Sequence, residues 1–423
     1  MNAGTLAHQS EKENSPNLLD DLLREQGNLT AVERFSQRHQ EGTSGLYQDL
    51  IPLSRPGKNE QYAFEVDLDA CSGCKACVTA CHSMNGLSEG ESWRDVGSLV
   101  SLDEAAPITV TSACHHCADP ACANGCPTLA YDKDPETGIV RHLDDQCIGC
   151  GYCEMKCPYD VPKYNDALGI VRKCDMCHSR LAVGEAPACV AACPNGAIKI
   201  RIVDTEAVPS SGQIVPGAFE SSYTKPTTTF KSSRDLSKRM PADSGSEKSP
   251  HSHPSLVFML TLTQLAVGIG ISAALLTSHT LAITAATIGM LGMVASVTHL
   301  GQPKKAWRAF LGLRKSWLSR EIVAFGAWQP PVLAAAVFPI PLFLWGAVAA
   351  GILAVICSAM VYVDTRRRSW RASLTFPRFF GTVILGAVTS YFYPPLILPA
   401  LLISLFERRQ FFKSMTVLKM PGN

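Results

Sequence analysis

The sequence lacks a net charge that would attract a strongly charged partner. Its 423 residues include 38 Lys and Arg against 37 Asp and Glu, which leaves a formal net charge of +1 at pH 7. Proteins that bind nucleic acid usually concentrate basic charge on one face, and this composition offers no such excess. No glycine-rich fingerprint for a flavin or nicotinamide cofactor stands out either. We therefore expect no nucleic-acid partner and no dinucleotide chemistry in this chain.

The N-terminal stretch "MNAGTLAHQSEKENSPNLLDD" also lacks the apolar core of a signal peptide and contains no twin arginine. Disulfides persist in oxidising compartments, to which such a leader would direct the chain. We therefore expect free thiols rather than disulfides. Residues 1–60 are predicted to be a polar N-terminal extension, either two short helices that pack on another part or a loosely ordered leader.

Cysteine, in contrast, is abundant and strongly grouped. Sixteen of the 17 cysteines fall into four quartets, and the remaining one, Cys357, is expected to be a packing residue in an apolar run. The quartets are Cys71, Cys74, Cys77 and Cys81; Cys114, Cys117, Cys122 and Cys126; Cys147, Cys150, Cys153 and Cys157; and Cys174, Cys177, Cys189 and Cys193.

The spacing within these quartets distinguishes between metals. Zinc sites usually pair two Cys-x-x-Cys knuckles that lie farther apart along the chain. The first quartet, "CSGCKACVTAC", instead follows the close spacing of a bacterial ferredoxin, in which the fourth cysteine binds the neighbouring cluster. The other three quartets each end in Cys-Pro, as the ferredoxin run does. The sequence therefore predicts four [4Fe–4S] clusters, with zinc as the alternative.

The composition divides the chain into further regions. Residues 61–204 hold the quartets between short strand-like pieces such as "YAFEVDL" and "AIKIRIV", which predicts an α+β, ferredoxin-like tandem 4Fe–4S domain. Residues 205–254 are rich in Ser, Thr, Pro and Lys and are predicted to be a linker. Residues 255–423 contain long apolar runs, which predict an all-α bundle of helices that cross a membrane.

The number of spans depends on the last apolar run. Runs at 255–276, 281–297, 322–339 and 342–363 can each cross a bilayer, whereas the run at 379–406 is broken by Pro394 and Pro395. It forms either one long span or two short ones. Basic and neutral connections alternate throughout if there are six spans, and basic connections face the cytoplasm. We therefore expect about six spans, possibly five, in the cytoplasmic membrane, with the cysteine domain on the cytoplasmic side.

The cysteine region resembles the four-cluster electron-transfer subunit of the dimethyl sulfoxide reductase family of molybdopterin enzymes. The similarity is carried by "CHHCADPACANGCP", "CIGCGYCEMKCPYDVPKYN" and "KCDMCHSRLAVGEAPACVAACP". The membrane region resembles that family's separate anchor subunit in "HLGQPKKAWRAFLGLRKSWLSREI" and "SLVFMLTLTQLAVG". The chain would thus be a fusion of two subunits, with fewer spans than the usual anchor.

This resemblance implies how the cysteines are shared. In the family the first quartet pairs with the fourth and the second with the third, and each fourth cysteine serves the cluster of the paired quartet. Cys193 would therefore join the first three cysteines of the first quartet, and Cys81 those of the fourth. Cys157 would join the second quartet, and Cys126 the third.

The resemblance also implies a non-catalytic subunit that oxidises a quinol, such as menaquinol, and passes electrons to a separate molybdopterin catalytic subunit. His299 and Glu321 are the candidate quinol-binding residues, because they flank the second and third runs and can accept protons. The alternative for both is a purely interfacial role. Two alternatives for the whole chain are electron flow in reverse, from a formate dehydrogenase-like partner to quinone, and a cluster-bearing sensor or scaffold.

Overall fold

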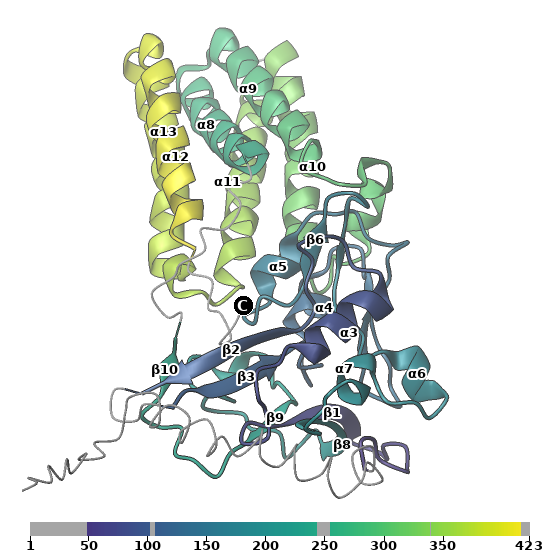
Figure 1. Cartoon of the computed structure of the whole chain (residues 1–423). Helices are drawn as coiled ribbons and strands as arrows, with labels where there is room; N and C mark the ends of the chain where they lie inside the picture. The colour runs from purple at the N-terminus through teal and green to yellow at the C-terminus, as the bar shows by residue number, and fades with distance from the viewer. Residues whose placement is uncertain (1–48, 102–105, 243–253, 339, 416–423) are drawn as a thin grey trace, which may run out of the picture.

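The computed structural model describes residues 49–101, 106–242, 254–338 and 340–415 (Figure 1). Residues 1–48 of the predicted N-terminal extension therefore lie outside the described residues, whereas residues 49–60 are described. The described chain forms an α+β part that carries the cysteine quartets and a helical part that stands on one side of it (Figure 1). This order of an α+β cluster domain followed by a helical region confirms the predicted fold class at that level.

Two small sheets support the α+β part. In the first, β1 (Glu60–Asp67) is central, with β8 (Ile198–Asp204) antiparallel on one side and β9 (Thr229–Lys231) parallel on the other. In the second, β2 (Asp95–Val100) lies between β3 (Ile108–Ser112) and β10 (Met240–Pro241). Aromatic and β-branched residues form these strands because such side chains pack well on a pleated surface. Phe64 opposite Ile200 is one buried pair.

Strands β9 and β10 both come from residues 205–254, the segment predicted as a linker. This segment therefore extends both sheets of the cysteine domain before the chain enters the helical part. Two hairpins complete the domain: β4 (Tyr131–Lys133) with β5 (Val140–His142), and β6 (Lys163–Asn165) with β7 (Ile170–Arg172). The first hairpin precedes the third quartet and the second precedes the fourth.

Short helices lie within the cysteine quartets. They are α3 (Ala76–Asn85), α4 (Ala121–Gly125), α5 (Tyr152–Lys156), α6 (His178–Ala182) and α7 (Ala188–Ala191). Tight turns with positive φ come before them, for example at Gly73 (φ 74°) and at Gly149 (φ 66°). Glycine adopts this conformation without steric cost. These turns reverse the backbone so sharply that successive thiols face the same space.

The helical part contains six long helices among the described residues. They are α8 (Pro254–Leu276), α9 (His279–Val297), α10 (Trp317–Val337), α11 (Pro341–Val363), α12 (Ala372–Phe392) and α13 (Ile397–Lys413). Four of the described helices, α8, α9, α11 and α12, are long and apolar enough to cross a membrane. The last apolar run is split into α12 and α13 at Pro394, so the two-helix alternative is the one observed.

The cysteine domain is docked against one end of this bundle. The connection from α9 to α10 includes a 3-10 segment, η3 (Pro303–Phe310), and lies on the loops of the second and third quartets. Backbone hydrogen bonds join Gln302 to Ile148 (3.0 Å) and Gly312 to Pro127 (2.8 Å). The connection from α11 to α12 is fastened by the ion pair between Lys156 and Asp364 at 2.6 Å. The basic connections between helices therefore lie on the side of the cysteine domain.

Candidate metal centres and a cavity at the membrane end

Two cavities of the cysteine domain are each lined by four cysteines. The first combines Cys71, Cys74 and Cys77 of the first quartet with Cys193 of the fourth. Cys193 reaches this space because β1 pairs with β8. These two strands are separated by 130 residues along the chain. We call this group of thiols site 1. Four convergent thiols are the donor set that a [4Fe–4S] cluster requires.

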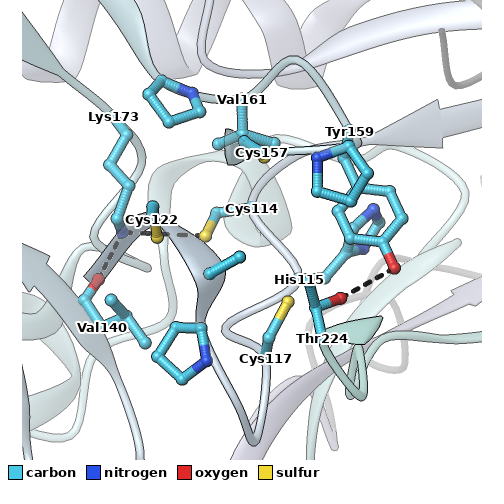
Figure 2. A pocket seen from close by; sticks show the side chains of 14 residues that line it. Cys114, His115, Cys117, Cys122, Val140, Cys157, Tyr159, Val161, Lys173 and Thr224 are labelled. Atoms are coloured by element: carbon cyan, nitrogen blue, oxygen red, sulfur yellow. Dashed lines mark hydrogen bonds between the residues drawn. The ribbon is translucent and has the colours of Figure 1, made fainter. Parts of the chain in front are cut away.

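The second cavity joins Cys114, Cys117 and Cys122 of the second quartet with Cys157 of the third. We call it site 3, because the sites are numbered by their order along the molecule. Figure 2 shows the sulfur atoms of Cys114, Cys117 and Cys122 around one space, with Cys157 behind it. The short helices α4 and α5 place the two quartets together, since each helix ends immediately before the fourth cysteine of its own quartet. That fourth thiol then points to the neighbouring site.

The remaining eight thiols form two further groups. Burial raises the pKa of Cys81 to about 12, and the adjacent thiols of Cys189 and Cys177 add to the increase. With Cys174, which also interacts with Cys81 and Cys189, they form site 2. Cys150 and Cys153 likewise interact with Cys126, and Cys150 with Cys147, and these four form site 4. The two cavities thus group eight of the thiols in the combinations that the family resemblance implies, and the interactions among the other eight are consistent with the remaining two combinations.

Electrostatic interactions between thiols of different sites indicate which sites are neighbours. Cys77 of site 1 interacts with Cys189 of site 2. Cys174 of site 2 interacts with Cys114 of site 3. Between sites 3 and 4 lies the buried phenol of Tyr131, which interacts with Cys122 and Cys153. The four sites therefore form a series, with site 1 and site 4 at its two ends.

Site 4 lies beside a cavity of about 370 Å³, which is located between the cysteine domain and the helical bundle. Cys150 of site 4 lines this cavity, together with Ile148, Tyr152 and Met155 of the same loop and helix. His299 and Glu321 line it from the bundle. The remaining wall is mostly apolar and comes from α8, α9, α10, α11 and the α9–α10 connection, with Met259, Met290 and Met293 among its side chains.

The two predicted proton-accepting residues thus face one cavity. Glu321 lies in the first turns of α10 and is buried (3 % exposed), and its Oε1 has no hydrogen-bond partner among the described groups. His299 follows the end of α9 and is half-buried. An ionisable group buried at membrane depth is costly and is usually retained for function. Cys357 packs in the core of the bundle, as expected.

Sequence reasoning did not identify the rest of the cavity wall. Tyr152 is buried and donates a hydrogen bond from its hydroxyl to the carbonyl of Val361 in α11 at 2.8 Å. Tyr362 lines the cavity from the same helix. Tyr152 lies within the third cysteine quartet, but no spacing rule of that motif assigns a role to it, and Tyr362 belongs to no motif. Their proximity arises only because α5 docks on the end of α11, so no local pattern in the sequence could have indicated it.

Comparison with known protein families agrees with this arrangement. Residues 106–202 match the family model of a 4Fe–4S dicluster domain, which covers the second to fourth quartets. Residues 252–398 match the model described as DMSO reductase anchor subunit (DmsC). The chain therefore contains a 4Fe–4S electron-transfer domain and a membrane anchor domain, and it is a membrane protein.

Individual relatives support the same assignment. The B subunit of anaerobic dimethyl sulfoxide reductase from Haemophilus influenzae is 38% identical over 156 residues, which are 34% of this chain and 76% of the relative. The subunit of the same name from Escherichia coli is 38% identical over 154 residues, 34% of this chain and 75% of the relative. The formate dehydrogenase-O iron-sulfur subunit of Escherichia coli is 35% identical over 157 residues, 33% of this chain and 52% of the relative. The chain therefore belongs to the dimethyl sulfoxide reductase family of iron–sulfur subunits and carries that family's anchor domain in the same polypeptide.

Proposed function

We propose that this protein transfers electrons from membrane quinol to a separate molybdopterin-containing catalytic subunit of the dimethyl sulfoxide reductase type. The observation that carries the proposal is the cavity that Cys150 shares with His299 and Glu321. A thiol of a cluster site and two proton acceptors meet there around a space large enough for a quinone ring. The two relatives named as B subunits of dimethyl sulfoxide reductases support the choice of partner.

The sixteen quartet cysteines are the proposed ligands of four [4Fe–4S] clusters, one at each of sites 1–4. Each cluster, when bound, carries a single electron at a potential set by cluster type, charge, hydrogen bonds and exposure. The cysteines hold the four positions in series, and α5 places the last position beside the bundle. The thiols that come from distant quartets tie the α+β part together, so cluster binding and folding of this domain are expected to be coupled.

His299 and Glu321 are the proposed proton acceptors. Quinol releases two protons together with its two electrons, and a dry cavity wall cannot accept them. A neutral imidazole takes up a proton near physiological pH, and a carboxylate can relay one to the aqueous face. The apolar remainder of the wall, which contains several flexible methionine side chains, suits a quinone ring of either common type.

The substrate is proposed to enter from the lipid. Met290 and Val294 of α9 line the cavity and are also exposed on the outer surface of the helix, 41% and 60% respectively. The two residues are one helical turn apart, so they form an apolar edge between the cavity and the membrane. A quinol with an isoprenoid tail can therefore reach His299 without crossing water.

We further propose six spans with the cysteine domain in the cytoplasm. Helices α10 and α13 would span together with the four more apolar helices, since all six lie in one bundle (Figure 1). Connections rich in Lys and Arg lie on the side of the cysteine domain, and such connections remain on the cytoplasmic side. Protease treatment of sealed membranes tests this orientation. Cleavage within residues 205–254 from the periplasmic side would contradict it.

The central test uses two substitutions in the cavity. His299→Ala removes the proposed proton acceptor, and Glu321→Gln keeps the shape of the side chain without its charge. Loss of general base catalysis typically slows a proton transfer by about 10²-fold or more. We expect reduction of the clusters by a quinol analogue to slow to that extent in each variant, measured by visible absorbance under anaerobic conditions.

Reduction by dithionite and the iron content, about sixteen atoms per chain for four bound clusters, are the controls and should not change in either variant. Parental rates of quinol oxidation in both variants would place the substrate elsewhere.

A second candidate function is electron flow in the reverse direction. It is favoured by the 35% identity to the iron-sulfur subunit of formate dehydrogenase-O. In that case a catalytic partner would reduce site 1, and the cavity would reduce quinone with protons supplied through Glu321 and His299. Purification with the partner subunit separates the two functions. Reoxidation of the reduced clusters by dimethyl sulfoxide supports the first, and their reduction by formate supports the second.

A further inference from the structure

A buried lysine lies between sites 2 and 3. The side chain of Lys173 is 2% exposed, and the residue directly precedes Cys174 of site 2. Its Nζ donates hydrogen bonds to the carbonyl oxygens of Val140 and Cys174 and lies 3.6 Å from the Sγ of Cys114 in site 3. Figure 2 shows this ammonium group at the edge of site 3, next to Cys114 and Cys122. A single positive charge is thus within reach of thiols from two sites.

A buried arginine occupies the corresponding place between sites 1 and 2. Arg94 is 1% exposed, and its Nη1 donates a hydrogen bond to the hydroxyl of Thr111 at 3.2 Å. The same hydroxyl lies 3.5 Å from the Sγ of Cys77 in site 1. On the other side Arg94 interacts with three thiols of site 2, which are those of Cys189, Cys174 and Cys81.

Neither cation forms a direct ion pair with a carboxylate among the described residues, although Asp175 lies close enough to Lys173 to interact with its charge. Nε and Nη2 of Arg94 have no hydrogen-bond partner among those residues. A buried charge is costly unless an opposite charge compensates it. The thiolates of the adjoining sites supply most of the negative charge around these two side chains, and Asp175 adds a smaller share beside Lys173.

We propose that Lys173 and Arg94 are shared cations of the cluster series, Lys173 raising the reduction potentials at sites 2 and 3 together and Arg94 those at sites 1 and 2. A positive charge stabilises the reduced form of a nearby cluster more than the oxidised form, because the reduced form carries one more negative charge. Site 2 is flanked by both cations. At the junction of sites 3 and 4 the uncharged phenol of Tyr131 takes the corresponding place. Electrons are therefore drawn from site 4 toward the inner sites.

The inference rests on the proposed cluster ligands. The test therefore distinguishes a failure of the ligand assignment from a failure of the shared-cation inference. Full-length protein is purified anaerobically with the substitutions Lys173→Met and Arg94→Met, which retain much of the side-chain volume and remove the charge. Iron content checks the ligand sets independently of any potential. Redox titration followed by electron paramagnetic resonance then gives the midpoint potentials.

We expect two of the four potentials to fall in each variant, with one of them common to both variants and one unchanged in both. Lys133→Met is the matched control. Its Nζ donates to the carbonyl oxygens of Cys117 (3.3 Å) and Ala118 (2.8 Å) at site 3 only, so it should lower a single potential. Lys173→Arg keeps the charge and should keep the potentials close to parental.

Three results would overturn the inference: a decrease at one site only in both methionine variants, no decrease in a variant that retains its iron, or an equal decrease at all four sites. If Lys173→Met loses iron, Arg94→Met tests the same rule at the other junction, where the expected pair of shifted potentials is sites 1 and 2.

Discussion

The two ends of the cysteine series are built differently. At site 1 Cys74 is exposed, whereas at site 4 Cys150 is half-buried and lines the mostly apolar cavity beside the helical bundle. The same local motif of closely spaced cysteines therefore serves two environments. An exposed end suits exchange of electrons with another protein, and an end beside apolar helices suits a substrate dissolved in lipid.

The largest effect should come from removing a ligand at each end. Cys150→Ser disrupts site 4, so we expect reduction by quinol to fall to background at every site. Cys74→Ser disrupts site 1 and should leave reduction of sites 3 and 4 by quinol near the parental rate, because the series is entered at the other end. Stopped-flow absorbance under anaerobic conditions measures both. Equal impairment of quinol oxidation in the two variants would contradict the assignment of the ends.

A smaller effect is expected where the two parts of the chain touch. A Cβ atom on Gly301 would overlap the carbonyl oxygen of Gly169 and the hydroxyl of Tyr164. Gly301→Ala should therefore weaken docking of the α9–α10 connection by about 1–3 kcal/mol, typical of overpacking. We expect slower reduction by quinol with unchanged reduction by dithionite.

Gly326→Ala is the matched control, since a Cβ atom there meets no neighbouring group within 4 Å. It should leave both rates unchanged. A Gly301→Ala variant that behaves like this control would show that the contact does not position the cavity.

The smallest effect concerns access from the lipid. Met290→Trp narrows the apolar edge of the cavity, and it should raise the KM for a long-tailed quinol roughly several-fold with little change in kcat, because the proton acceptors are untouched. Leu291→Trp is the control, since Leu291 is 57% exposed and does not line the cavity. Steady-state kinetics with long-tailed and short-tailed analogues measure the difference. The same KM in both tryptophan variants would argue for another entrance.

Much of the candidate site could be recognised from sequence because its signals are local. Four thiols within eleven residues, such as Cys71 to Cys81, indicate a cluster without knowledge of the fold. Long uncharged runs indicate helices that can span a membrane, because their length matches the bilayer. The position of His299 and Glu321 on either side of one connection could also be read from the order of residues. Pro394 and Pro395 interrupt the last apolar run in the sequence, but the sequence allows either one long helix or two short ones there.

Other features depend on contacts between residues far apart in the chain. Sequence spacing alone could not say which quartet receives Cys193, and the pairing of β1 with β8 decides it. Residues 229–231 lie in a segment whose composition predicts a linker, yet they form an edge strand. Backbone hydrogen bonds to β1 outweigh the weak local preference of these residues for an irregular conformation. No sequence pattern around Lys173 indicates its surroundings, because Val140 and Cys114 are distant from it along the chain. Only the fold encloses its charge between two sites.

The sequence by itself thus determined the kinds of group in this protein: sixteen thiols in ferredoxin spacing, a cluster domain before a membrane anchor, and two proton acceptors beside a basic connection. The tertiary structure decided how these groups meet, including the order of the four sites, the cavity beside Cys150 and the two shared cations. The reason is physical. Ligand type and helix length are properties of short segments, whereas shared ligands, cavities and buried charges exist only where distant segments pack against one another.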